Sequence, residues 1–385
     1  MDSYLNGNRI KIARKYRGLT IEEFANKIGI TKQTVSNYEL GKREPSYKEL
    51  NAITNVLNFP YRYFVEKDNI EVNYNSTFFR SYLTAQKKYK EKQIIKVSHI
   101  RKYYSIISKY IKFPSLNLPE YNGESSPEDM AYNLRELWKL SDSPINNLLR
   151  IAEKNGIIVS FFDSSEDTNK IDAFTNFVDN IWIIALSKNT ISLARTHFNI
   201  AHELGHIILH KHIMENNEEL DRKDFNDIED EANKFASSFL LPANNFIKDV
   251  MLYNRALKLD RFIELKKIYN VSIKAMIYRL FDLGIISREK MTNLYKQISK
   301  RGWNKEEPLD NINNITPPSL FRDSINLLLE KKFSVEELLD EFSDGGISLN
   351  SDDIEELLNL DKGKLKVNKI YDNPVIKMND IIDNK

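Results

Sequence analysis

The spacing of apolar residues over positions 1–67 predicts several short amphipathic helices. The first ends near Gly18, and its apolar positions are Ile10, Ile12 and Ala13. Thr20 and Glu23 then form a capping-box pattern, in which each side chain satisfies a free backbone N–H at a helix start. The second helix stops at Gly29 and presents one apolar face, made of Ile21, Phe24, Ala25 and Ile28.

A third short helix, "KQTVSNYELG", follows a tight turn and is capped by Thr31. We expect its apolar contacts at Val35, Tyr38 and Leu40. Two short helices joined by a glycine-containing turn make a helix-turn-helix. The outward positions carry side chains that can hydrogen-bond to base edges in the major groove of DNA, namely Lys32, Gln33, Thr34, Ser36 and Asn37. Lys42 and Arg43, just past the helix, suit phosphate contacts.

Residues 68–145 predict a helical linker region. The stretch 78–113 is expected to be helical, and residues 78–112 carry ten basic side chains against one acidic, Glu91. This basic surface either extends the DNA footprint or is a solvated face, and the second interpretation is the simpler one. Three prolines within residues 114–129 predict a boundary loop after it.

The pattern changes to α+β from residue 146. The segment "NNLLRIAEKNG" predicts an amphipathic helix, and "IIVSFF" predicts a buried strand because it is rich in β-branched and aromatic residues. The segments 171–179 and 180–188 predict two more strands, paired around a turn at Asp179 and Asn180. A helix carrying four of the six histidines follows.

The segment "HELGH", residues 202–206, carries the clearest chemical signal. Residues four apart lie on one face of a helix, so the imidazoles of His202 and His206 can reach one metal ion. Glu203 lies to the side, where it can accept a proton from a zinc-activated water. The short pattern also occurs by chance, and a histidine-rich surface helix is the alternative. The preceding strand and the otherwise apolar helix favour a metal site.

The following histidines are poor candidates for the third ligand. His212 falls where the metzincin pattern HExxHxxGxxH has its last histidine, but Leu209 stands at the glycine position, so the helix has no reason to break there. His210 lies beyond easy reach of a tetrahedral site. We therefore expect the third ligand on another helix.

A second helix, residues 228–242, offers that ligand. Glu229 and Asn233 are four apart and share a face, whereas Glu231 points elsewhere. A glutamate on this helix would complete a His2Glu zinc site with an open position for water. The choice between Glu229 and Glu231 is the open question of the site.

Two resemblances sharpen these predictions. Residues 19–58 resemble the helix-turn-helix domain of the lambda-repressor/Cro type, which implies that the outward side chains from Lys32 to Asn37 read double-stranded operator DNA and that the protein binds as a homodimer. The segments "ARTHFNIAHELGHIILH" and "IEDEANKFASSFLLP" resemble the ImmA/IrrE family of metallopeptidases, family M78. This second resemblance implies zinc ligands at His202, His206 and Glu229, Glu203 as the general base, and a repressor as the substrate.

Composition limits the remaining classes. The chain of 385 residues is 41% hydrophobic and 29% charged, with a net charge of +1, which is typical of a globular protein with several domains. It has no cysteine, so disulfides and thiolate metal sites are excluded. Neither a transmembrane segment nor a signal peptide is expected, which favours the cytoplasm.

The sequence therefore predicts a multidomain chain. Its parts are an all-α helix-turn-helix domain (1–67), a helical linker (68–145), an α+β zincin-like metallopeptidase domain (146–308) and a helical C-terminal region without an assigned role (309–385). The favoured hypothesis is a DNA-bound regulator that cleaves a repressor or itself. A transcription factor with a structural or sensory zinc site is one alternative. A protease whose N-terminal domain docks to a partner repressor is the other.

Overall fold

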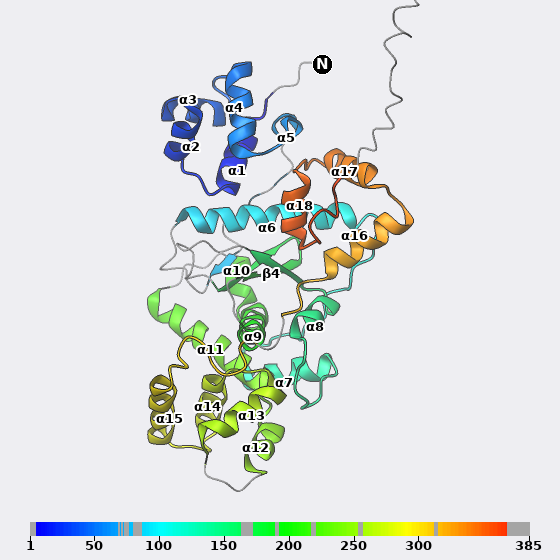
Figure 1. Cartoon of the computed structure of the whole chain (residues 1–385). Coiled ribbons are helices and arrows are strands. Elements are labelled where there is room, and N and C mark those ends of the chain that lie inside the picture. Colours follow the sequence, from blue (N-terminus) through cyan, green and yellow to red (C-terminus); the bar gives the residue numbers. More distant parts are fainter. Residues whose placement is uncertain are drawn as a thin grey trace, which may run out of the picture.

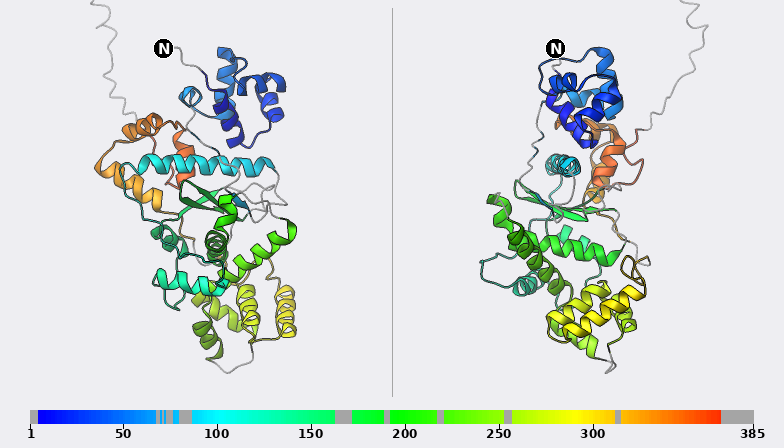
Figure 2. Two further views of the ribbon diagram at one scale, coloured as in Figure 1. Left: turned by 180° about the vertical axis from the view of Figure 1, so that it is seen from behind. Right: turned by 90° about the vertical axis from the view of Figure 1, so that its left-hand side faces the viewer.

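A four-stranded sheet lies at the centre of the molecule, between the long helix α6 (Lys87–Ile107) and the helix α9 (Leu193–Leu209) (Figure 1). The N-terminal helices lie beyond α6, and a group of helices lies at the opposite end (Figure 2). This arrangement is seen in a computed structural model, which describes residues 5–67, 70, 72, 77–79, 87–162, 172–188, 192–216, 221–252, 257–311 and 315–367. The chain is thus a helical N-terminal region followed by an α+β part, as the sequence predicts.

The N-terminal region folds as expected from its caps. The helices are α1 (Gly7–Tyr16), α2 (Ile21–Ile28), α3 (Lys32–Glu39), α4 (Tyr47–Leu57) and α5 (Tyr61–Val65). The capping box of Thr20 and Glu23 is present, and Gly29 ends α2 in the left-handed conformation that favours glycine. The prediction that Leu40 makes an apolar contact with the core is wrong, because this residue is 61% exposed. It lies at the C-cap of α3, where the chain turns away from the core.

The sheet has the strand order β1-β3-β4-β2. Its strands are β1 (Thr77–Phe79), β2 (Ile158–Phe162), β3 (Ala173–Val178) and β4 (Ile181–Ser187). The predicted hairpin of β3 and β4 is confirmed, and Asp179 and Asn180 both have positive φ, as a two-residue hairpin turn requires. β2 runs parallel to β4, and β1 runs antiparallel to β3.

The expected helix over residues 78–113 is only partly correct. A strand, β1, occupies its first residues, and the helix α6 begins at Lys87. β1 pairs with β3, about a hundred positions further along the chain, so no local pattern could reveal it. The segment 80–86 lies outside the described residues.

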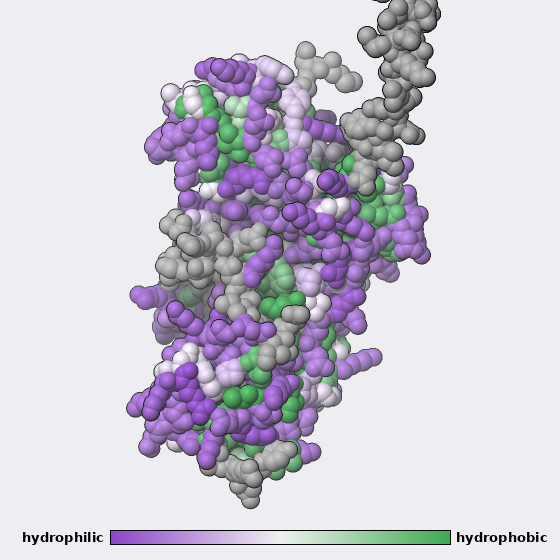
Figure 3. Space-filling model, viewed as in Figure 1, coloured by the Kyte–Doolittle hydropathy of each residue, from purple (hydrophilic) through white to green (hydrophobic). Residues whose placement is uncertain are grey.

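Alternating side chains make the sheet a partition between two apolar cores. One face, toward α6, carries Ile158, Phe162, Phe174, Ile183 and Ala185. The other face, toward α9, carries Val159, Ala173, Trp182, Ile184 and Leu186. Apolar residues show only in small separate patches on the hydrophilic face seen in Figure 3, because most of them lie in these cores.

Helices complete the core beneath the sheet. They are α7 (Pro127–Leu137), α8 (Leu148–Lys154), α10 (Lys211–Asn216), α11 (Arg222–Leu240), α12 (Ala243–Met251), α13 (Leu259–Tyr269), α14 (Ile273–Asp282) and α15 (Arg288–Lys300). α11 packs closely along α9 and α7. None of the helices in the described part of the chain combines the length and hydropathy that a membrane crossing requires.

The C-terminal region supplies α16 (Leu320–Lys331), α17 (Val335–Asp344) and α18 (Ser351–Leu358), which join the core on the α6 side. α18 touches both neighbouring parts of the molecule. The guanidinium of Arg17, the C-cap of α1, binds both carboxylate oxygens of Asp353 at 2.6 Å. Ser160 in β2 donates to the carbonyl oxygen of Leu357 at 3.4 Å. The predicted helical character is therefore confirmed for the described part of this region, and α18 links the helix-turn-helix to the sheet.

Candidate metal centre

The helix α9 is almost wholly interior, which makes its histidines unusual. Ser192 caps its start by accepting from the backbone N–H of Arg195. All residues from Asn199 to His210 are buried. Buried polar side chains need hydrogen-bond partners, because moving a polar group out of water costs free energy unless a new hydrogen bond replaces those it made to water. The partners come mainly from α11.

A close helix crossing brings those partners to α9. Gly205 faces Ala232, and a Cβ atom at Gly205 would lie only 3.1 Å from the Cα of Ala232. The absence of a side chain at Gly205 thus lets α11 approach. As a result, Glu229 and Asn233 of α11 reach histidines of α9, and Glu231 reaches its C-cap residue, His210.

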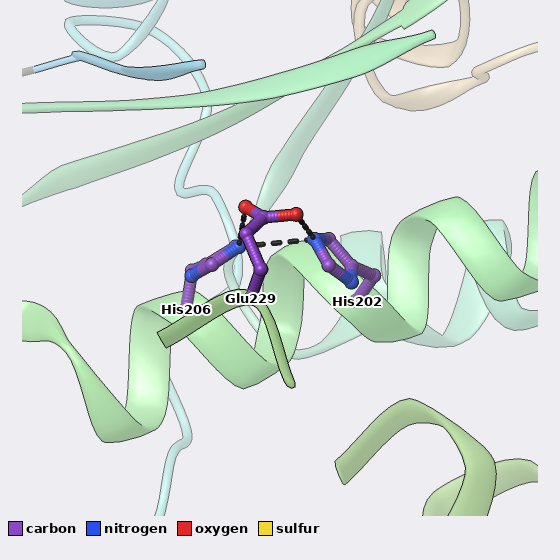
Figure 4. Close-up of side chains that lie close together, drawn as sticks. All are labelled: His202, His206 and Glu229. Atoms are coloured by element: carbon purple, nitrogen blue, oxygen red, sulfur yellow. Dashed lines mark hydrogen bonds and ion pairs between the residues drawn. The ribbon is translucent and has the colours of Figure 1, made fainter. Parts of the chain in front are cut away.

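Three possible ligand atoms converge at this crossing (Figure 4). The Nε2 atoms of His202 and His206 are 3.0 Å apart. Carboxylate oxygens of Glu229 lie 3.6 Å from Nε2 of His202 and 3.3 Å from Nε2 of His206. Within the described ranges this is the one group of three or more His, Cys, Asp or Glu residues that could hold a metal ion.

These separations fit zinc. Tetrahedral ligands about 2.0–2.1 Å from a zinc ion lie about 3.3 Å from one another. The three observed separations of 3.0, 3.3 and 3.6 Å scatter around that value. Two imidazoles and one carboxylate are also the donor set of hydrolytic zinc sites that keep a fourth position open.

The protonation states also suit a metal. Burial tends to raise the pKa of Glu229, but the adjacent imidazoles of His202 and His206 outweigh it and lower the pKa to about 2. Burial lowers the pKa of His206 to about 3. At neutral pH, Glu229 is therefore an anion and His206 is neutral, as metal binding requires.

The second nitrogen of each imidazole has its own partner. Nδ1 of His202 lies 3.1 Å from Oδ1 of Asn233. Because an amide oxygen only accepts, Nδ1 of His202 carries the hydrogen and its Nε2 presents a lone pair. Nδ1 of His206 lies 3.1 Å from Nδ1 of His210. The role of Asn233 was not predicted, although its spacing of four from Glu229 indicated a shared face.

Glu203 lies beside this cluster. Its side chain is 1% exposed, and its Oε2 accepts a 2.5 Å hydrogen bond from the hydroxyl of Thr175 in β3. The strand therefore helps to hold the carboxylate in place. No local pattern pointed to Thr175, because its proximity to Glu203 depends on how the sheet packs on α9.

Glu231 and the remaining histidines occupy other places. The structure brings Glu229 to the two Nε2 atoms, whereas Oε2 of Glu231 lies 2.8 Å from Nε2 of His210. His212 is exposed. His197 is buried, and its Nε2 accepts from the backbone N–H of Leu148, so this histidine packs inside the domain.

The side chains expected to read DNA lie together on α3, at the far end of the molecule from α9 (Figure 1). Lys32 and Gln33 are exposed, and Thr34, Ser36 and Asn37 are half-buried. Gln33 donates to Asn37 at 3.3 Å, so the two amides form a pair on the surface. Lys42 and Arg43 are also exposed, and Arg43 lies 3.6 Å from Glu49.

Comparison with known proteins identifies both parts. Residues 10–64 match the helix-turn-helix family model, and residues 152–281 match the M78 peptidase model, described as the IrrE N-terminal-like domain. The chain therefore joins a helix-turn-helix region to an M78-type peptidase domain, which confirms both resemblances.

Three regulators of Bacillus subtilis (strain 168) are similar to part of the chain. The uncharacterized HTH-type transcriptional regulator YqaE is 40% identical over 62 residues, 16% of this chain and 53% of its own. The SPbeta prophage-derived uncharacterized HTH-type transcriptional regulator YonR is 39% identical over 51 residues, which are 13% of this chain and 47% of its own. The HTH-type transcriptional regulator ImmR is 36% identical over 64 residues, which are 17% of this chain and 50% of its own. The chain spans about half the length of these curated relatives.

Proposed function

We propose that this chain, which joins a helix-turn-helix to an M78-type domain, is a DNA-binding transcriptional regulator and a zinc-dependent endopeptidase. Its action is to cleave a repressor or itself and so switch gene expression in the cytoplasm. The observation that carries the proposal is the convergence of His202, His206 and Glu229 beside the buried carboxylate of Glu203.

His202, His206 and Glu229 would hold the zinc ion. When bound, zinc supplies Lewis-acid activation of water and of the peptide carbonyl. Glu203 then takes a proton from the attacking water and passes it to the amine nitrogen that leaves. The Thr175 hydroxyl donates to Oε2 of Glu203 and so keeps this carboxylate oriented during the transfer.

The presence of Glu203 favours a catalytic over a structural zinc site. It is buried on the ligand helix but stands outside the group of ligand atoms. A purely structural site needs a fourth ligand rather than an additional carboxylate beside an open position. Glu203 thus has a role in hydrolysis and none in metal retention.

The helix-turn-helix supplies the DNA-binding function. α3 presents Lys32, Gln33 and Asn37 outward, where basic and amide groups can pair with base edges of a double-stranded operator. Lys42 and Arg43 follow the helix and suit phosphate contacts that set register. We propose binding as a homodimer to a two-fold operator, the arrangement common to this kind of domain.

The experiment is incubation of the zinc-loaded full chain with helix-turn-helix repressors encoded beside its gene, followed by mass analysis of fragments. The proposal expects one defined cut in a repressor or in the chain, and no cut with Glu203→Gln. If zinc binds but no repressor and no copy of the chain is ever cut, a zinc sensor replaces the peptidase. If the full chain shows no salt-dependent DNA binding, docking to a partner repressor replaces operator binding.

A further inference from the structure

We infer that His210 and Glu231 are positioning residues, which hold the ring of His206 in the orientation and tautomer that the metal needs. This inference rests on the metal centre proposed above and assigns a role to two residues that stand outside its ligand set. It concerns how firmly the ion is held and not the chemistry of cleavage.

The contacts form an unbroken chain. Nδ1 of His206 lies 3.1 Å from Nδ1 of His210, and Nε2 of His210 lies 2.8 Å from Oε2 of Glu231. The three groups come from two helices, since His206 lies on α9, His210 is the C-cap of α9 one turn further on, and Glu231 belongs to α11. This row of contacts from His206 to Glu231 therefore depends on the helix crossing at Gly205.

When the metal is bound, only one placement of the ring hydrogens lets both contacts, His206 to His210 and His210 to Glu231, be hydrogen bonds. Nε2 of His206 must present its lone pair, so its hydrogen is on Nδ1 and is donated to His210. Nδ1 of His210 must then accept, which places the hydrogen of this ring on Nε2. That hydrogen is donated to the carboxylate of Glu231, which in its ionised form is purely an acceptor. Every donor thus meets an acceptor.

Burial makes the arrangement firm. The side chain of His206 is fully buried, that of His210 is 3% exposed, and that of Glu231 is 51% exposed. Water therefore has little access to the His206–His210 contact, while Glu231 is anchored at the surface end. A carboxylate behind an imidazole fixes the tautomer and raises the basicity of the nitrogen that faces the metal.

The two ligand histidines are supported differently. His202 has the neutral amide of Asn233 behind it, whereas His206 has a second imidazole and then a carboxylate. Loss of an outer partner of a metal-bound histidine typically weakens metal affinity by about 10–100-fold. We expect an effect of this size when His210 loses its acceptor nitrogen.

The test measures zinc affinity of the full chain by competition with a coloured chelator, and the visible spectrum after loading with Co²⁺. His210→Phe should weaken zinc binding by about 10–100-fold and change the cobalt bands. His210→Asn should recover most of the affinity, because an amide oxygen can replace the acceptor Nδ1. His212→Phe, an exposed histidine two residues on, is the matched control and should change neither readout.

Glu231→Ala keeps the test open if His210→Phe does not fold, because the Glu231 side chain is half exposed. It should bind one zinc ion at saturation but with several-fold lower affinity. Wild-type affinity and an unchanged cobalt spectrum in both His210→Phe and Glu231→Ala would overturn the inference. A wild-type chain that binds zinc but cuts nothing would instead refute the proposed peptidase and leave this inference standing.

Discussion

Substitution of Glu203 by glutamine separates catalysis from metal binding and from folding. The glutamine amide has nearly the same shape as the carboxylate, and its oxygen can still accept from the Thr175 hydroxyl. The 2.5 Å contact that anchors the residue to β3 is therefore kept. The amide nevertheless cannot take up a proton near neutral pH, so the general base is lost.

The expected effect is large on the rate and small on everything else. General-base catalysis contributes about 10²–10⁴-fold, which corresponds to about 2.7–5.4 kcal/mol in the activation free energy. Zinc content should stay near that of the wild type, because Glu203 lies outside the ligand group. DNA affinity should also be unchanged, since α3 lies beyond α6, on the opposite side of the sheet from α9.

The assay has three readings on the same preparation: initial cleavage rate, zinc per chain, and a mobility shift with operator DNA. An E203Q protein that cleaves at the wild-type rate would refute the assignment of the base. An E203Q protein that loses zinc would show instead that Glu203 is a ligand. In cells, the variant should leave target promoters occupied while the switch no longer fires.

Three further predictions address the other groups. Gln33→Ala should relax sequence preference by about 1–3 kcal/mol, while Lys42→Ala should weaken binding to all sequences and lower the salt slope by about one, as titrations at several salt concentrations would show. Glu229→Ala should lose most of its zinc and Glu231→Ala should keep about one ion per chain, by elemental analysis; the reverse would mean that the wrong face of α11 was chosen. Burial lowers the pKa of His99 to about 3 in the folded protein. As the pH falls below about 6.5, His99 therefore becomes protonated in the unfolded chain while it stays neutral in the folded one. The free energy of unfolding should then fall by about 1.4 kcal/mol per pH unit from this residue, and His99→Gln should reduce that slope in urea titrations.

Local signals in the sequence predicted much of this structure. The capping box at Thr20, the turn at Asp179 and the face shared by His202 and His206 depend on residues within a few positions of one another. Such patterns act through neighbouring side chains and backbone groups, so they survive in any fold that contains the element. Periodicity left Glu229 and Glu231 as alternatives, and only the family resemblance favoured Glu229.

The features that escaped prediction depend on distant contacts. β1 exists because β3 offers it a partner, and Thr175 reaches Glu203 only because β3 packs on α9. The contact of His210 with Glu231 similarly follows from a helix crossing that periodicity cannot fix. The pairing of Arg17 with Asp353, 336 positions apart, is the clearest case.

The seam between the helix-turn-helix and α6 bears on what a cut in the chain would accomplish. Tyr16 and Tyr63 both pack against His99 of α6, and Arg17 is held by Asp353. None of these contacts depends on an intact backbone between residues 67 and 87. Fragments produced by a single cut there would stay associated, and the DNA-bound fragment would not diffuse away. A single self-cut in that segment would therefore not by itself release promoters, whereas cleavage of a separate repressor meets no such obstacle.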